Sequence, residues 1–69
     1  MNIRSPIAGS VIRVCVAVGD KVVVDDEIAI VESMKMEIPV VSEHAGTVAE
    51  ILIEEKLQVQ EDDVLIVLG

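Results

Sequence analysis

The chain has 69 residues, one cysteine, no aromatic residue of the Phe, Tyr or Trp type, and a formal net charge of −8. The negative charge argues against nucleic acid as a ligand, because neutralising phosphates requires Lys and Arg. No apolar run approaches the roughly 20 residues of a membrane span, and the first residues lack the long apolar region of a signal peptide. The length predicts one domain over residues 1–69. The single cysteine excludes an intramolecular disulfide, which is typical of the reducing cytoplasm, and we expect the protein there.

The apolar residues form short runs separated by polar turns, which predicts β-strands. Val, Ile and Leu dominate these runs, and β-branched residues favour pleated sheet. Gly9, Gly19 and Gly46 are expected at turns, since glycine adopts positive φ easily. Asp25-Asp26 marks a further turn. The predicted strands are a short one that begins at Ile3 and ends at Pro6, followed by residues 10–18, 21–24, 27–33 and 36–42.

The middle of the chain holds the segment Glu32-Ser33-Met34-Lys35-Met36-Glu37. Apolar runs at residues 28–31 and 38–41 flank it, and two such runs joined by a short link predict a β-hairpin. The link contains no Gly or Asn, although tight hairpin turns favour residues that adopt positive φ. We therefore expect Lys35 at the tip of a rigid hairpin, exposed to solvent and to other proteins.

The second half repeats the first at an offset of 37 residues, the separation of Gly9 and Gly46. Such a repeat implies two similar halves related by an approximate two-fold axis, and neither half can bury its apolar face alone. Short strands with frequent turns predict a small all-β sandwich or barrel. The repeat places the lysine hairpin at one end and both termini at the other. The matching pairs include Ser5 and Ser42, Ala8 and Ala45, Val11 and Val48, Val14 and Ile51, Val22 and Val59, Asp25-Asp26 and Asp62-Asp63, and Ile28 and Leu65.

Met34-Lys35-Met36, preceded by Glu32-Ser33 and followed by Glu37, resembles the attachment site of biotinyl domains. This family includes the biotin carboxyl carrier proteins and is related to the lipoyl domains of 2-oxoacid dehydrogenases. The likeness is strongest to the small free-standing biotin/lipoyl attachment proteins and covers residues 3–68. It implies a barrel-sandwich hybrid, a flattened β-barrel of two four-stranded antiparallel sheets with pseudo-two-fold symmetry.

The resemblance implies that Lys35 carries covalent biotin, attached by a biotin protein ligase that uses biotinyl-adenylate. The chain would then be a non-catalytic biotin carboxyl carrier protein. Its biotin arm would move carboxylate between the biotin carboxylase and carboxyltransferase subunits of an acyl-CoA carboxylase, acting on acetyl-CoA or a similar substrate. Covalent tethering gives a high effective concentration without strong docking. The residues expected to be recognised by the ligase or the carboxylase are Glu32, Ser33, Met34, Met36 and Glu37.

Other functions stay open at this point. The attached group could be lipoate, alone or alongside biotin, although lipoyl domains more often have Asp before and Ala after the lysine. The chain could instead be a structural adaptor that carries no acyl group. An independent enzyme is not expected, because no nucleophile–base set, metal-ligand cluster or phosphate loop is present.

Several residues also have purely structural interpretations. Met34 and Met36 could pack under the turn as part of the core, since Met often fills gaps there. Cys15 is expected to be an inert buried residue, and His44 a surface turn residue. The acidic pairs and triplets at Asp25-Asp26 and Glu61-Asp62-Asp63 are expected to form solvated turns and to bind no metal, because the spacing of a calcium loop is absent.

The chain departs from the family pattern at three turn positions. Family members often have glycine where this chain has Asp25, Lys56 and Asp62. Asp tolerates positive φ better than most residues, and Lys does not. We therefore expect the turn around Lys56 to have a different shape.

Overall fold

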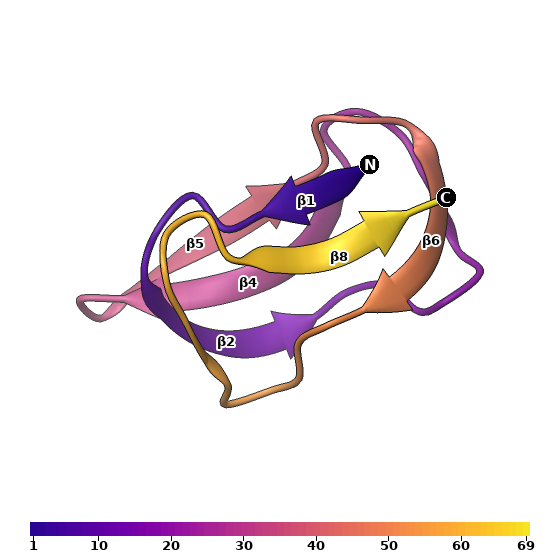
Figure 1. Cartoon of the computed structure of the whole chain (residues 1–69). Coiled ribbons are helices and arrows are strands. Elements are labelled where there is room, and N and C mark those ends of the chain that lie inside the picture. The colour runs from indigo at the N-terminus through magenta and orange to yellow at the C-terminus, as the bar shows by residue number, and fades with distance from the viewer.

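Eight β-strands form the protein in a computed structural model that describes all 69 residues. Figure 1 labels the longer ones. They make two four-stranded sheets, with the strand orders β1-β8-β6-β3 and β5-β4-β2-β7, and every pairing is antiparallel. The predicted all-β sandwich of two four-stranded antiparallel sheets is confirmed. The strands are β1 (Asn2–Arg4), β2 (Gly9–Val14), β3 (Lys21–Val22), β4 (Glu27–Ser33), β5 (Met36–Val41), β6 (Gly46–Ile51), β7 (Gln58–Val59) and β8 (Val64–Leu68). The structure contains no helix with the length and apolarity needed to cross a membrane.

The core lies between the two sheets and consists entirely of aliphatic side chains. Both halves contribute, because neither sheet is built from one half of the sequence alone. Burying an aliphatic side chain of this size stabilises a fold by about 1.5–3 kcal/mol, so these residues supply the main driving force for folding. The buried cluster comprises Ile3, Val11, Val22, Ile28, Ala29, Val31, Val40, Val48, Ile53, Val59, Leu65, Ile66 and Leu68.

The hydrogen bonds between the halves repeat with the sequence. The amide of Asp25 donates to the carbonyl of Ser42 at 2.8 Å, and the amide of Asp62 donates to the carbonyl of Ser5 at the same distance. Each turn is therefore held by the other half of the chain, and the two halves interlock as the repeat predicts. Ser5 and Ser42 are also the only buried polar residues, with 1% and 0% of their surface exposed.

The turn at Lys56 corrects one prediction. Lys56 adopts a left-handed φ of 75°, and its counterpart Gly19 has a φ of 96°, so the two turns have the same handedness. The amide of Lys56 donates to the carbonyl of Val11 at 2.6 Å, as the amide of Gly19 donates to Val48 at 2.8 Å. A left-handed lysine costs roughly 1–2 kcal/mol. The hydrogen bond to the other half of the molecule overrides this local preference.

The first long strand also differs from its prediction. Strand β2 ends at Val14 and begins at Gly9, instead of covering residues 10–18. A bulge in the pairing with β4 lies between Val11 and Arg13, which interrupts the regular alternation. The short strand β3 stops at Val22, earlier than the predicted residue 24, because the chain turns at once toward Asp25.

Cys15 is exposed, so the prediction of a buried cysteine is wrong. Its neighbours Val14 and Val16 pack against the core, and successive side chains in an extended segment point to opposite sides. The Cys15 side chain therefore faces outward, while its amide still donates to the carbonyl of Ile28 at 2.9 Å.

The lysine hairpin and the two termini lie at opposite ends of the molecule, as the repeat predicts (Figure 1). The molecule is elongated, with extents of 31, 19 and 18 Å. The amino group of Met1 donates to the carbonyl of Leu68 at 2.8 Å, which brings the two ends of the chain together. The hairpin therefore projects alone at the other end, away from both termini.

Candidate functional site

Strands β4 and β5 form the predicted hairpin, and Lys35 lies in its turn. Ser33 and Met36 are the last paired residues, so Met34 and Lys35 alone make the connection. Their φ values are 52° and 65°, the left-handed region at both central positions. A two-residue connection of this kind is a type I′ turn, whose twist matches the right-handed twist of the flanking strands. The short link therefore determines the backbone at Lys35.

This turn contains unfavourable residue types. Type I′ turns favour Asn and Gly because both central residues need positive φ, and a side chain such as Met or Lys costs roughly 1–2 kcal/mol there. The pairing between β4 and β5 offsets this cost, since it extends from Ser33 and Met36 back to Glu27 and Val41. The hairpin thus holds the backbone of Met34 and Lys35 in a conformation that these residue types disfavour.

The turn projects beyond the core. Met34 is 91% exposed and Met36 is 64% exposed, and Lys35 is exposed between them. The alternative that these methionines pack as core residues is therefore wrong. The physical reason is that β4 extends past the core: its last fully buried residue is Val31, and the strand continues for two more residues before the turn. The result is an amine between two exposed apolar side chains.

Two carboxylates lie just below the turn. Glu32 and Glu37 are direct partners across β4 and β5, and both are exposed. Like charges directly opposite one another destabilise a strand pair. Ser33, which is half-buried, separates Glu32 from the turn. The tip therefore presents a lysine amine, two apolar side chains and a repelling pair of negative charges within six consecutive residues.

Two glycines expected at turns have a different role. Gly9 and Gly46 open strands β2 and β6, and neither has a positive φ. Their lack of a side chain serves close packing against a neighbouring strand. Gly19 does lie in a turn, with a φ of 96° and open space around the position of a Cβ atom.

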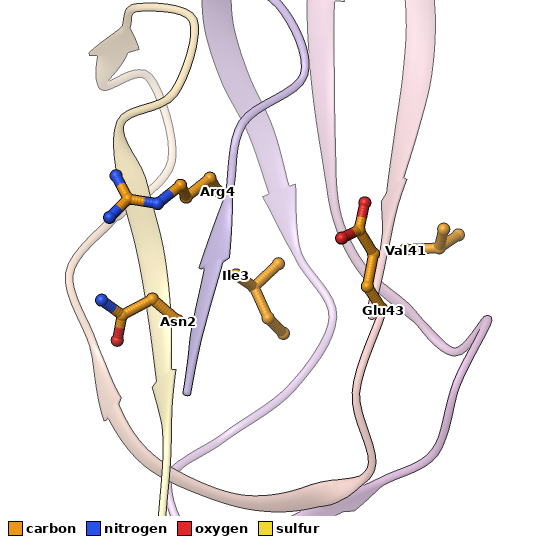
Figure 2. A pocket seen from close by; sticks show the side chains of 5 residues that line it. All are labelled: Asn2, Ile3, Arg4, Val41 and Glu43. Carbon is orange, nitrogen blue, oxygen red and sulfur yellow. The ribbon is translucent and has the colours of Figure 1, made fainter.

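The structure also contains a small open hollow of about 90 Å³, which the sequence did not indicate. It lies between β1 and β5, the edge strands of the two sheets, and its lining residues are remote in sequence. In Figure 2 the Ile3 and Glu43 side chains approach the hollow, while Asn2 and Arg4 extend to the other side of β1. The guanidinium of Arg4 donates instead to the carbonyl of Asp62 at 2.9 Å. No residue of the lysine tip lines this hollow, so the two features are separate.

The remaining candidates have structural roles. His44 is half-buried, and its amide donates to the hydroxyl of Ser42, which in turn donates to the His44 carbonyl. The carboxylates of Asp26 and Asp63 each accept a hydrogen bond from a backbone amide of their own turn, at 2.9 and 2.8 Å. No three His, Cys, Asp or Glu side chains are grouped closely enough to hold a metal ion.

Comparisons with known proteins point to one family. A biotin/lipoyl family profile, described as "Biotin-requiring enzyme", matches residues 1–68. The Biotin/lipoyl attachment protein of Bacillus subtilis (strain 168) is 43% identical over 69 residues, which is 100% of this chain and 94% of that protein. The Biotinylated protein TB7.3 homolog of Mycobacterium leprae (strain TN) is 36% identical over 68 residues, covering 99% of this chain and 96% of that protein.

Solved structures agree with this assignment. The chain superposes on part of the Kluyveromyces lactis urea carboxylase with a TM-score of 0.92 and 30% identity, covering 100% of this chain and 6% of that one. A single-chain, multi-domain long-chain acyl-CoA carboxylase matches with a TM-score of 0.87 and 23% identity, covering 96% of this chain and 7% of that one. The second likeness is one of fold. The chain thus spans nearly the whole of its small relatives and a small part of each carboxylase.

Proposed function

The chain belongs to the biotin/lipoyl attachment family, and we propose that Lys35 is its attachment residue and that biotin is the attached group. The observation that carries the proposal is the position of Lys35 in the outermost turn, where the strand pairing holds it between two exposed methionines. The name of the Mycobacterium leprae relative supports biotin in particular.

Attachment is an acyl transfer that this chain does not catalyse itself. The lysine ammonium first loses a proton to a base of the modifying enzyme, since a protonated amine is not a nucleophile. The Lys35 nitrogen then attacks the acyl carbon of biotinyl-adenylate. A C–N bond forms, the C–O bond to the phosphate breaks, AMP leaves, and the amide nitrogen loses a second proton. An exposed lysine on a narrow hairpin can enter an enzyme cleft without moving the sandwich.

The side chains around Lys35 suit recognition by that enzyme. Met34 and Met36 offer flexible, polarizable apolar surface, which adapts to a partner at little cost in shape. Glu32 and Glu37 offer two negative charges on one face of the hairpin, complementary to a basic patch. Ser33, between Glu32 and the turn, is within the same recognition segment.

As a carrier, the domain serves two active sites in turn. When bound, biotin supplies the ring that accepts and releases carboxylate, while this chain supplies a rigid base for the arm. We propose the biotin carboxylase and carboxyltransferase subunits of an acyl-CoA carboxylase, for acetyl-CoA or a similar substrate, as the partners. The likeness to part of a urea carboxylase supports carboxylase partners. A tethered group reaches millimolar effective concentration without tight docking, so the carrier surface needs only weak contacts.

The intact mass of the protein purified from its own cells tests the proposal, together with peptide mapping across Lys35. We expect one biotinyl adduct, and we expect it on Lys35. Lys21 and Lys56, both exposed, serve as internal controls because the same digestion reports on them. An unmodified Lys35 in cells that contain an active ligase would contradict the proposal and favour a structural adaptor.

Lipoate is the second candidate, and the name of the Bacillus subtilis relative, Biotin/lipoyl attachment protein, is the observation that favours it. The chemistry at Lys35 is the same, because either acid forms an amide with the same nitrogen. The two adducts differ in mass, so the same measurement separates them. A lipoyl adduct alone would reject biotin and keep Lys35 as the attachment residue.

A further inference from the structure

Gly9 and Gly46 are equivalent in the repeat but differ in their surroundings. A Cβ atom built on Gly9 overlaps the backbone carbonyl oxygen of Glu32 and lies 2.9 Å from Cγ1 of Val31. A Cβ atom built on Gly46 meets the Cβ of Leu68 at 3.3 Å and the carbonyl oxygen of Gly69 at 3.4 Å. Unbonded carbons are most stable about 3.5–4.0 Å apart. A side chain at Gly46 therefore needs a shift of a few tenths of an ångström, whereas one at Gly9 overlaps a backbone atom.

The atom that excludes it belongs to the base of the lysine hairpin. Glu32 is two residues before Met34, and its partner on β2 is Ser10, the residue after Gly9. Gly9 itself pairs with Val59 of β7, so the start of β2 is held between β7 and the hairpin end of β4. Strand β4 has one other neighbour in its sheet, β5, which is an edge strand. Strain introduced at Gly9 therefore falls directly on the β4 backbone, two residues before the turn that holds Lys35.

We propose that Gly9 is a positioning residue for the acylation of Lys35, an inference that rests on the function proposed above. The missing side chain lets β2 approach the Glu32 carbonyl closely, and this contact sets where the hairpin leaves the sandwich. A methyl group at position 9 displaces the hairpin base and, with it, the lysine nitrogen in the enzyme cleft. The acyl transfer itself is unchanged, with the same C–N bond formed and the same C–O bond broken.

The size of the expected effect follows from the geometry of bond formation. Reacting atoms must lie about 3–3.5 Å apart and aligned, and a misplacement of about 1 Å can cost about 100-fold in rate. Contacts made by the flexible Met34 and Met36 side chains tolerate such a shift better than the nitrogen does. We therefore expect Gly9→Ala to lower kcat by about 10- to 100-fold and to change KM less than about threefold.

The experiment measures acylation of the full chain by a biotin protein ligase with biotin and ATP. Wild type, Gly9→Ala and Gly46→Ala are compared by intact mass against time, below the melting temperature of every variant. Gly46→Ala is the matched control, because it adds the same methyl group at the equivalent position of the other half, remote from the hairpin. A third variant, Ile66→Val, destabilises the buried core from β8, a strand of the other sheet, and controls for loss of stability alone.

A kcat that falls in Gly9→Ala and in neither control supports the inference. A small amine-reactive ester should label Lys35 equally in all variants, because exposure of the amine is not what changes. Equal kcat in Gly9→Ala and Gly46→Ala would overturn the inference and leave the proposed function intact. So would an unfolded Gly9→Ala chain, since the strain would then spread through the sandwich. A wild-type chain that is not acylated would overturn the proposed function and the inference with it.

Discussion

The two ends of the sandwich use equivalent strand pairs, β4 with β5 and β1 with β8, but end in different ways. At the lysine end the pairing continues to Ser33 and Met36, and a two-residue turn joins the strands. At the other end no turn joins them. The amino group of Met1 donates to the carbonyl of Leu68 and the amide of Leu68 donates back to the carbonyl of Met1, at 2.8 and 2.6 Å.

The β1–β8 pair shows that such a strand pair can cover the core with no turn joining its strands. Met34 and Lys35 are exposed, and both adopt a left-handed φ that is unfavourable for their residue types. Elsewhere the chain meets the same backbone demand with Gly19, Asp25 and Asp62, which tolerate it better, and with Lys56, whose amide is bonded to Val11 of the other half. Backbone preference therefore does not account for Met34 and Lys35, and the proposed attachment of an acyl group at Lys35 does.

The sharpest test of this contrast replaces the amine of Lys35, the proposed attachment residue. Lys35→Arg keeps the charge and the length of the side chain but removes the nucleophilic nitrogen, because a guanidinium stays protonated at all accessible pH values. We expect no acylation in intact mass spectra. The free energy of unfolding should change by less than about 0.5 kcal/mol, as for other exposed positions. Acylation that persists at another residue would show that the hairpin is not the attachment site.

A core substitution should have the opposite effect. Leu65 is fully buried, and Leu65→Ala removes contacts and leaves a cavity, which costs about 2–5 kcal/mol. Met34→Ala, at the exposed tip, should cost less than about 0.5 kcal/mol. Denaturant unfolding of both variants measures the difference. Similar losses in the two variants would mean that the turn contributes to the core after all.

The interlocking turns permit a test of the repeat itself. The hydroxyl of Ser5 donates to the carbonyl of Ile7 at 2.6 Å and accepts from its amide at 3.4 Å, and Ser42 does the same for His44. Removing either hydroxyl leaves a partner unsatisfied, which costs about 1–3 kcal/mol. We expect Ser5→Ala and Ser42→Ala to lower stability by similar amounts. A loss confined to one of them would show that only one half carries this constraint.

Relief of strain in the turn should stabilise the protein modestly. Asn adopts left-handed φ more easily than Met, so Met34→Asn should raise the free energy of unfolding by about 0.5–1 kcal/mol. It should also slow acylation, since an apolar contact is lost. Gly19→Asn, at a left-handed glycine, is the control and should bring no gain in stability. Faster acylation of Met34→Asn would mean that the ligase does not use this methionine.

Much of this architecture follows from short-range and repeating patterns. The alternation of apolar residues and the recurrence of Gly9 as Gly46 predict strands, sheets and the two-fold axis, because side-chain burial in a sheet has a period of two. The hairpin and its lysine follow from two apolar runs around a short link. Each of these patterns is local or repeats at a constant spacing.

The features that were not predicted depend on distant partners. The bulge between Val11 and Arg13 arises from pairing with β4, and no local pattern marks it. The conformation of Lys56 is held by a hydrogen bond to Val11 in the other half. The need for glycine at position 9 comes from the Glu32 carbonyl, 23 residues further on. Contacts of this kind become visible only when the halves are assembled.

The smallest expected effect separates stability from recognition at one residue. Glu37 faces Glu32 directly across the hairpin, so Glu37→Gln removes a repulsion and should stabilise the protein by about 0.2–1 kcal/mol at low salt. The gain should shrink in 1 M salt, where the screening length falls to about 3 Å. If the pair serves a basic partner, the same variant should raise the KM for acylation while kcat stays within about twofold. Glu50→Gln, an exposed carboxylate on β6 whose partner is Val67, is the matched control and should change neither quantity. A Glu37→Gln variant with an unchanged KM at low salt would show that the carboxylate pair destabilises the fold and does not contribute to recognition by the ligase.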